Sequence, residues 1–486
     1  MPQIPLKVSN LLRKGRRRAV RTAMILLFLM SAMSAFAEGL FSPEERTRLV
    51  TFWNAPGRWR VGPLPDVASR GPWQVRLTPD GSTWLLKYQI AAGSAAAPPT
   101  QEATAAVAPT DIWKTWVQSK IEYDRRQAQQ AADAANAALK PAVDPVKPID
   151  PVPASVKPGD SVKSADPTKP GGVTGAIAPP SAPGPIPADL LMAAGNPPAF
   201  AAAVAPLLTT VTFDDGETLV YPSHIALPKA FAYYRFPQGT VAYGPRLTDL
   251  PQAEVDALFK TAGMTPSEQR IAFAVSKLEG GFESVNTYDT GYVSVGFIQF
   301  ITHEDGKHSL AEVLLREKRE HPDDFARDFH AFGIDVTPDG VFTVVDPATG
   351  AELIGSEAVR KTIDDKRLVA IFQRAGRHSM AFRAAQIEVA KAHYWPTEDI
   401  FTIMVNGQAV SGKVSDVIAS EAGIATLFDR KVNRGSIKPF EEVLAKVMTA
   451  HNVTQLKDVV PYEREIVAGL KYRTDYLQDP ILSQPK

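Results

Sequence analysis

Cysteine is absent from the 486-residue sequence, so the chain can form neither a disulfide nor a thiolate metal site. An excess of charge is absent too, because 53 lysines and arginines balance 53 aspartates and glutamates. The sequence also lacks a glycine-rich loop that would cradle phosphate groups. We therefore expect no cofactor, and we expect packed apolar cores to provide the stability of the chain.

The first 37 residues have the plan of a bacterial secretory signal. Seven basic residues lie between Lys7 and Arg21, an apolar run covers residues 23–35, and Ala35-Phe36-Ala37 forms an Ala-x-Ala cleavage site. The apolar run is shorter than the roughly 20 residues that a membrane-spanning helix needs. The sequence therefore predicts cleavage near Ala37 and a periplasmic or secreted protein, with an uncleaved N-terminal anchor as the alternative.

Removal of this signal changes the charge of the protein. The mature chain keeps its 53 acidic residues but loses seven of the 53 basic ones, which leaves a net charge of −7. A mildly acidic exported protein is a poor candidate for binding nucleic acid. The charge is compatible with neutral glycans and would attract a polycation such as chitosan.

Composition divides the chain into four parts. Residues 141–198 hold 15 of the 41 prolines and show neither a helical nor a strand period, which predicts a disordered spacer. The expected parts are a signal peptide at 1–37, a small tryptophan-rich α+β domain at 38–124, an Ala-rich helix with the Pro-rich linker at 125–209, and a catalytic domain at 210–486 with a β-hairpin insertion near 333–352.

The small domain is expected to begin with a helix at 42–53. Extended segments at 73–77 and 84–88 follow, and Pro79-Asp80-Gly81 between them reads as a hairpin turn. Six of the seven tryptophans lie before the linker. They either build the core of this domain or stack on sugar rings, in which case the domain binds a cell-wall or envelope partner.

The chain's strongest chemical signal is Glu279, near the end of a predicted helix. Thr265, Pro266 and Glu268 form a capping box with proline at the first helical position, and Gly280-Gly281 predicts the helix end. On the last turn, the free carbonyls and the helix dipole disfavour an ionised carboxylate. Glu279 would therefore hold the proton that a general acid needs.

A second carboxylate, Asp289, follows Glu279 and opens a glycine-spaced, partly apolar run. Two carboxyl groups can break a glycosidic bond, because one protonates the leaving oxygen while the other activates water or stabilises the sugar cation. The alternative is an ordinary solvated glutamate, a glycine helix cap and a turn aspartate. Glu283 is the less favoured second carboxylate, since Gly280-Gly281 should break the helix before it.

This region resembles the lysozyme-like superfamily of glycoside hydrolases and lytic transglycosylases, and most closely its chitosanase branch. The residues that carry the resemblance are Glu279, Asp289, Tyr292, Ser294, Gly296, Phe297, Ile298 and Phe300. It implies a mainly α (α+β), two-lobed catalytic domain in which Asp289 is the base and Ser294 helps to hold the attacking water. The run Gly296-Phe297-Ile298-Gln299 is similar to the Gly-Leu-Met-Gln signature of lytic transglycosylases. That similarity implies that Gln299 lies near the substrate, with Tyr292 and Gly296 in the same segment.

A weaker resemblance to chitosanases follows near the C-terminus. Residues 427–435 are similar to a chitosanase helix that contains Asp and ends in His-Gly, although Arg434 replaces the histidine. The resemblance implies a supporting role for Asp429, with Arg473 of the C-terminal helix as its partner.

These patterns predict an exported glycosidase that cleaves β-1,4 bonds in an amino-sugar polymer. Peptidoglycan is the preferred substrate; the alternatives are chitosan, lytic transglycosylase chemistry, and a non-catalytic protein that binds the cell wall. A cation site at His303, Glu304, Asp305 and His308 is not expected, since their spacing matches no established ligand pattern.

Overall fold

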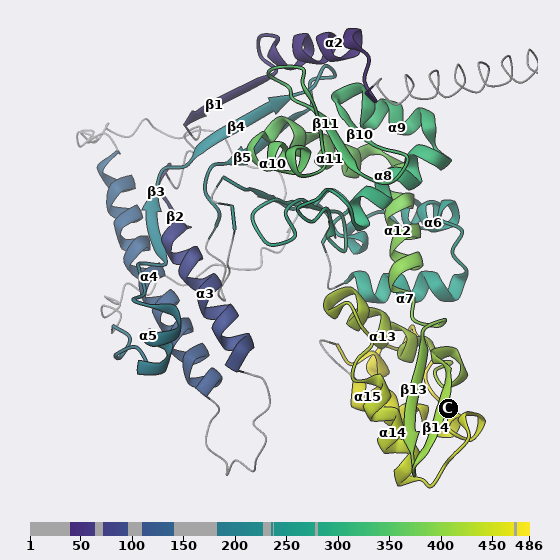
Figure 1. The fold of residues 1–486 in the computed structure, drawn as a ribbon. Helices are drawn as coiled ribbons and strands as arrows, with labels where there is room; N and C mark the ends of the chain where they lie inside the picture. The colour runs from purple at the N-terminus through teal and green to yellow at the C-terminus, as the bar shows by residue number, and fades with distance from the viewer. Residues whose placement is uncertain are drawn as a thin grey trace, which may run out of the picture. The chain divides into compact units, whose positions relative to one another are not determined.

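The computed structural model describes residues 39–63, 71–95, 109–139, 182–226, 235–236, 238–277, 280–470 and 474–486. The predicted signal peptide, most of the Pro-rich linker, Glu279 and Arg473 lie outside these residues. Helices account for about 52% of the described residues and strands for about 15%. The expected mainly helical α+β class is therefore confirmed (Figure 1).

The chain forms two compact units. The larger comprises Met1–Val61, Thr209–Ser223 and Gln238–Lys486, and the smaller comprises Gly62–Leu208 and His224–Pro237. This division differs from the expected one, because the helix at 42–53 belongs to the larger unit. Phe41 and Leu49 pack against Val345 there, and the indole nitrogen of Trp53 donates to the carbonyl of Phe332 at 3.0 Å.

The larger unit contains most of the helices. They are α2 (Pro43–Asn54), α6 (Gln252–Thr261), α7 (Pro266–Ser276), α8 (Ser309–Glu320), α9 (Pro322–Asp328), α10 (Ser356–Asp364), α11 (Lys366–His378), α12 (Met380–Tyr394), α13 (Glu421–Arg434), α14 (Phe440–Ala450) and α15 (Glu463–Leu470). The helix expected at 42–53 is α2, and it begins with a capping box in which Ser42 is the N-cap and Glu45 reaches back to it. Helices α11 and α12 each begin with a side-chain N-cap, which is Asp365 for α11 and Ser379 for α12.

Short sheets accompany these helices, and the first two are antiparallel. One has the order β6-β7-β8-β9, built from β6 (Val241–Ala242), β7 (Val285–Asn286), β8 (Ser294–Val295) and β9 (Phe300–Ile301). A second has the order β10-β11-β12, from β10 (Ile334–Val336), β11 (Phe342–Val345) and β12 (Glu352–Ile354). The second sheet corresponds to the hairpin insertion expected near 333–352. A third has the order β1-β4-β5, from β1 (Trp59–Pro63), β4 (Leu207–Thr212) and β5 (Thr218–Pro222).

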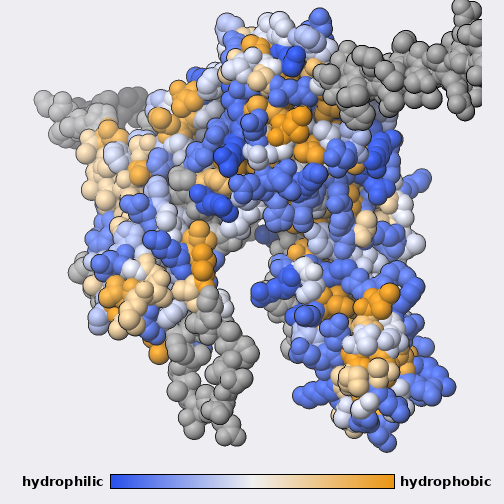
Figure 2. Space-filling model, in the orientation of Figure 1, coloured by the Kyte–Doolittle hydropathy of each residue, from blue (hydrophilic) through white to orange (hydrophobic). Residues whose placement is uncertain are grey.

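A two-stranded hairpin, β13 (Ile400–Val405) and β14 (Gln408–Lys413), lies in the C-terminal part of the larger unit. Phe401, Ile403 and Val405 point into a core shared with α13, α14 and α15. Side chains alternate along a strand, so Ile400 and Met404 face outward and are 76% and 61% exposed. Figure 2 shows hydrophobic residues gathered at the surface over this hairpin.

The smaller unit consists of α3 (Pro79–Ala95), α4 (Pro109–Ala138), α5 (Ala188–Ala194) and an antiparallel pair of β2 (Gln74–Leu77) and β3 (Ala201–Val204). The hairpin expected around Pro79-Asp80-Gly81 is wrong, since residues 84–88 lie inside α3. Thr78 acts as the N-cap instead: its hydroxyl accepts from the Gly81 amide at 3.0 Å, and its carbonyl accepts from Ser82. Proline then occupies the first helical position, where its missing amide costs nothing.

The described end of the predicted linker is folded. Leu190 on α5 and Phe200 beside β3 are fully buried, and the Phe200 amide donates to Asp124 of α4 at 2.7 Å. This segment carries enough apolar surface to join the smaller unit. In the described parts of the chain, no helix is both long enough and apolar enough to span a bilayer.

Candidate functional site

The sheet β6-β7-β8-β9 organises the predicted site. Its register pairs Val241 with Asn286, Asn286 with Ser294, and Ser294 with Ile301. Paired residues lie on the same face of a sheet, so the neighbouring row contains Ala242, Val285, Val295 and Phe300. Val285, Val295 and Phe300 are at most 1% exposed. The sheet therefore has one core face and one face that carries Asn286 and Ser294.

Helix α7 leads toward this sheet. Its capping box is confirmed: Thr265 accepts from the Glu268 amide, and Glu268 accepts from the Thr265 amide at 2.9 Å. The expected helix end is wrong, since α7 ends at Ser276, with Lys277 as its C-cap. Neither Gly280 nor Gly281 has a positive φ.

Gly281 serves close packing instead. A Cβ added to Gly281 would lie 2.1 Å from the carbonyl oxygen of Pro245, a contact that no larger residue could make. The Gly281 amide donates to the hydroxyl of Ser284 at 2.9 Å. Backbone approach, rather than a left-handed helix cap, accounts for Gly281 at this position.

The chain that follows Glu279 is hydrogen-bonded to the predicted Gly-x-x-Gln segment. The Gly280 amide donates to the carbonyl of Phe297 at 2.9 Å, and the Gly296 amide donates to the carbonyl of Ser284 at 2.8 Å. Gly296 has a φ of 89°, and a Cβ there would lie 2.1 Å from the side-chain oxygen of Gln386. Glycine is therefore required at position 296.

Gln299 closes the turn that Gly296 opens. Its φ is 59°, and both its amide and its side-chain nitrogen donate to the Gly296 carbonyl, at 3.1 and 2.9 Å. The side chain that the resemblance assigned to substrate thus stabilises its own turn. Tyr292, also at a positive φ of 66°, is 6% exposed and donates its hydroxyl to Glu304 at 2.9 Å.

Asp289 lies half-buried in the loop between β7 and β8. Its Oδ2 accepts from the side-chain amide of Asn286 at 2.7 Å, and its Oδ1 accepts from the Gly291 amide at 2.9 Å. The buried hydroxyl of Ser294 lies close by, since a Cβ added to Gly291 would be 2.6 Å from Ser294 Oγ and 3.2 Å from Asp289 Oδ1. The structure thus brings Asp289 and Ser294 together.

Glu283, the less favoured carboxylate, is 4% exposed. Its Oε2 accepts from Nε of Arg377 on α11 at 2.8 Å, and Arg377 also donates to Glu217 at 2.9 Å. A Cβ on Gly244 would lie 1.9 Å from its Cγ. The ion pair and the tight packing give Glu283 a structural role, because no polymer can reach it.

Asp429 and Arg473 are the second predicted pair. Asp429 lies on α13, which packs against α7, and is 1% exposed. Its carboxylate accepts from the side chain of Asn433 at 3.2 Å, while the expected partner Arg473 lies outside the described residues. Asp429 therefore sits inside a helix interface, where it can support the fold but not contact a polymer.

His303 and His308 stack edge to face, with ring centroids 4.4 Å apart. Burial, and next the charge of His303, lower the pKa of His308, which favours a neutral ring. Across the part of the chain that the structure describes, no three His, Asp or Glu side chains are arranged to hold a metal ion.

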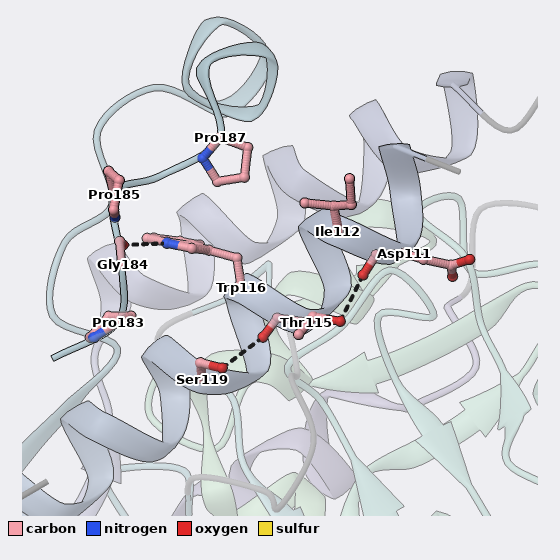
Figure 3. Close-up of a pocket in the computed structure, with 9 residues that line it drawn as sticks. All are labelled: Asp111, Ile112, Thr115, Trp116, Ser119, Pro183, Gly184, Pro185 and Pro187. Atoms are coloured by element: carbon pink, nitrogen blue, oxygen red, sulfur yellow. Dashed lines mark hydrogen bonds between the residues drawn. The ribbon is translucent and has the colours of Figure 1, made fainter. Parts of the chain in front are cut away.

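The tryptophans of the small predicted domain divide between core and surface. Trp53, Trp84 and Trp113 are at most 5% exposed, so these three build cores. Trp116 borders a hollow of about 450 Å³ on the smaller unit, between α4 and residues 183–187 (Figure 3). Its indole nitrogen donates to the Gly184 carbonyl at 2.8 Å, which fixes the ring against this proline-rich segment.

Comparison of the chain with protein-family models, with curated proteins and with solved structures gives no match. Any assignment of function therefore rests on the site geometry and on the sequence resemblance.

Proposed function

We propose that this protein is an exported glycosidase that cleaves β-1,4 bonds in an amino-sugar polymer, with peptidoglycan as its substrate. Glu279 is the general acid and Asp289 is the base, in a lysozyme-like two-lobed domain formed by the larger unit. One observation carries the proposal: the Gly280 amide, directly after Glu279 in sequence, donates to Phe297 at 2.9 Å. That bond ties the Glu279 segment to the sheet beside which Asp289 is held.

The contacts of Asp289 suit a base. A carboxylate has about four acceptor positions, and Asn286 and Gly291 occupy one on each oxygen. The remaining positions can accept a proton from water. The two bonds fix the orientation of the carboxylate, and Ser294 Oγ beside it can bind the same water.

The N-terminal segment and the smaller unit complete the proposal. A secretory signal would deliver the enzyme to the periplasm or the exterior, where peptidoglycan lies. The smaller unit, which contains the proline-rich segment, would hold the enzyme to a cell-wall or envelope partner. No nucleic acid and no cofactor take part.

Mass analysis of soluble products tests the chemistry. Mature protein is incubated with purified peptidoglycan and with chitosan, alongside Glu279→Gln and Asp289→Asn. Glu357→Gln and Asp323→Asn serve as matched controls, because both side chains are exposed on other helices. We expect wild type and both controls to release reducing-end fragments of peptidoglycan, and both site variants to release none.

Other outcomes separate the alternatives. Fragments from chitosan but not from peptidoglycan would make the enzyme a chitosanase. Anhydro-muropeptides that persist in Asp289→Asn would identify a lytic transglycosylase in which Glu279 acts alone. Binding to peptidoglycan without any product, unchanged by Glu279→Gln, would refute the enzymatic proposal and leave a wall-binding protein.

A further inference from the structure

Tyr243 is a large aromatic side chain that the fold leaves in solvent. It follows β6 directly and is 78% exposed. Within the described residues, no hydrogen bond engages its hydroxyl and no aromatic ring packs on it. The sequence around it, Val241-Ala242-Tyr243-Gly244-Pro245, carries no motif that would single the residue out.

The chain around Tyr243 runs alongside the Glu279 segment. Val241 and Ala242 pair with Asn286 and Val285 in antiparallel register. Further along, Arg246 forms an isolated antiparallel bridge with Gly281. Tyr243 therefore lies between the first pairing and the bridge, beside the residues that connect Glu279 to β7.

Glycines keep the two segments close on both sides of Tyr243. A Cβ on Gly239 would lie 2.5 Å from the carbonyl oxygen of Thr287, and one on Gly244 would lie 1.9 Å from Cγ of Glu283. A Cβ on Gly281 would lie 2.9 Å from the carbonyl carbon of Gly244. The backbone on both sides of Tyr243 therefore packs closely against residues 281–287.

The alternation of side chains along a strand indicates from which face of the sheet the Tyr243 ring projects. Val241 shares a row with Asn286 and Ser294, and a residue two positions along an extended chain points to the same side. Tyr243 thus projects from the face that carries Asn286, the residue that orients Asp289 through a 2.7 Å hydrogen bond. The opposite face is the buried row.

We propose that Tyr243 is a substrate-binding residue that stacks its ring on a sugar unit of the polymer, next to the unit attacked at Asp289. This inference rests on the proposed function and names one contact of that site. The face of a pyranose ring presents C–H groups, which pack on the electron-rich face of an aromatic ring. Strand pairing and close packing on both sides of Tyr243 restrain its backbone, which lowers the conformational freedom lost on binding.

Kinetics with soluble β-1,4-linked oligosaccharides of N-acetylglucosamine, and with solubilised peptidoglycan strands, test this role. Loss of the ring in Tyr243→Ala should raise KM about tenfold, since aromatic contacts contribute about 0.5–1.5 kcal/mol beyond area burial. We expect kcat to stay within about twofold, because the ring binds ground and transition states alike. Tyr243→Phe should retain the wild-type KM, while Tyr243→Leu, apolar but not aromatic, should behave as Tyr243→Ala.

The control is Ile354→Ala, another exposed apolar side chain, on β12, at 49% exposure. It should leave KM unchanged, and thermal melts should show all variants folded. If wild type releases products while Tyr243→Ala has an unchanged KM, or loses only kcat, the stacking role is refuted and the glycosidase proposal stands. If wild type releases no products from any glycan, the proposed function falls and this inference falls with it.

Discussion

Replacement of Glu317 by glutamine should make the larger unit more stable than it is in the wild type, by an amount that grows as pH rises. Glu317 lies on α8 and is fully buried. Ser379 donates to its Oε1 at 3.5 Å, and its Oε2 has no hydrogen-bond partner within the described residues. Burial, followed by the charges of Asp328 and Asp324, raises the pKa of Glu317 from 4.5 to about 9. The folded protein therefore keeps this side chain protonated at neutral pH.

The sign of the effect follows from proton linkage. Between pH 4.5 and about 9, folded protein retains a proton that the unfolded chain has released, so stability falls as pH rises. Each pH unit in that window costs about 1.4 kcal/mol. At pH 7 the wild type has therefore lost about 3 kcal/mol relative to acid conditions. Glutamine has nearly the same shape as glutamate and carries no charge in the folded or the unfolded state. The Glu317→Gln variant should therefore keep the stability that the wild type loses.

Urea denaturation at pH 5, 7 and 9, followed by circular dichroism, measures the difference. We expect Glu317→Gln and wild type to unfold with similar free energies near pH 5. At pH 7 the variant should be more stable by about 3 kcal/mol, with a larger gap at pH 9. Hydrogen exchange of peptides from α8 and α9 should show the same trend and locates it in the larger unit.

Glu357→Gln is the matched control, because Glu357 is exposed on α10. Its unfolding free energy should stay within about 0.5 kcal/mol of wild type at every pH. A Glu317→Gln difference that does not change with pH would refute the reasoning. So would a variant less stable than wild type at pH 9, since the buried carboxyl would then not be the group that titrates.

Two further predictions concern ion pairs. Arg377→Met should destabilise the protein by about 3 kcal/mol in urea denaturation, since it leaves Glu283 buried without its partner; Lys413→Met, which removes the exposed pair with Glu398, should cost less than about 1 kcal/mol, and equal losses would contradict a structural role for Glu283. Burial opposes ionisation of Glu421, but bonds from Arg270, Ser267 and Ser483 outweigh it and lower its pKa from 4.5 to about 2. The stability that Glu421 provides is therefore present above pH 4.5 and lost as pH falls toward 2. Arg270 is 43% exposed, so screening reduces the effect to about 1–2 kcal/mol; Glu421→Gln should flatten the acid limb of the stability profile by that amount, and an unchanged acid limb would rule out this pair as its cause.

Local signals account for the parts of the fold that the sequence predicted. Thr265 with Glu268 is a capping box that involves neighbours three positions apart, so it can be read directly from the sequence. The hairpin signals around 333–352 are equally local, and β10, β11 and β12 form there. Such elements depend little on the rest of the chain.

The errors arose where distant contacts decide the structure. Thr78 and Pro79 signal a helix start as well as Pro79-Asp80-Gly81 signals a turn, and the buried ring of Trp84 in the smaller unit favours the helix. Glycine is common at helix ends, but at position 281 it is required because the carbonyl of Pro245 leaves no room for a side chain. Neither partner is adjacent in sequence, so no local pattern reports it.

The same limit applies to the choice between carboxylates. Glu279 and Glu283 lie four positions apart, and the sequence separates them only by the two glycines between them. The structure places Glu283 in the interior, because Arg377, 94 positions further along, closes on it, and Gly244 leaves room for its side chain; Glu279 lies outside the described residues. An ion pair in this position holds the segment from Gly280 to Ser284 against α11 and β6. Glu283 therefore acts on this segment through its ion pair with Arg377, which is why Arg377→Met should cost stability.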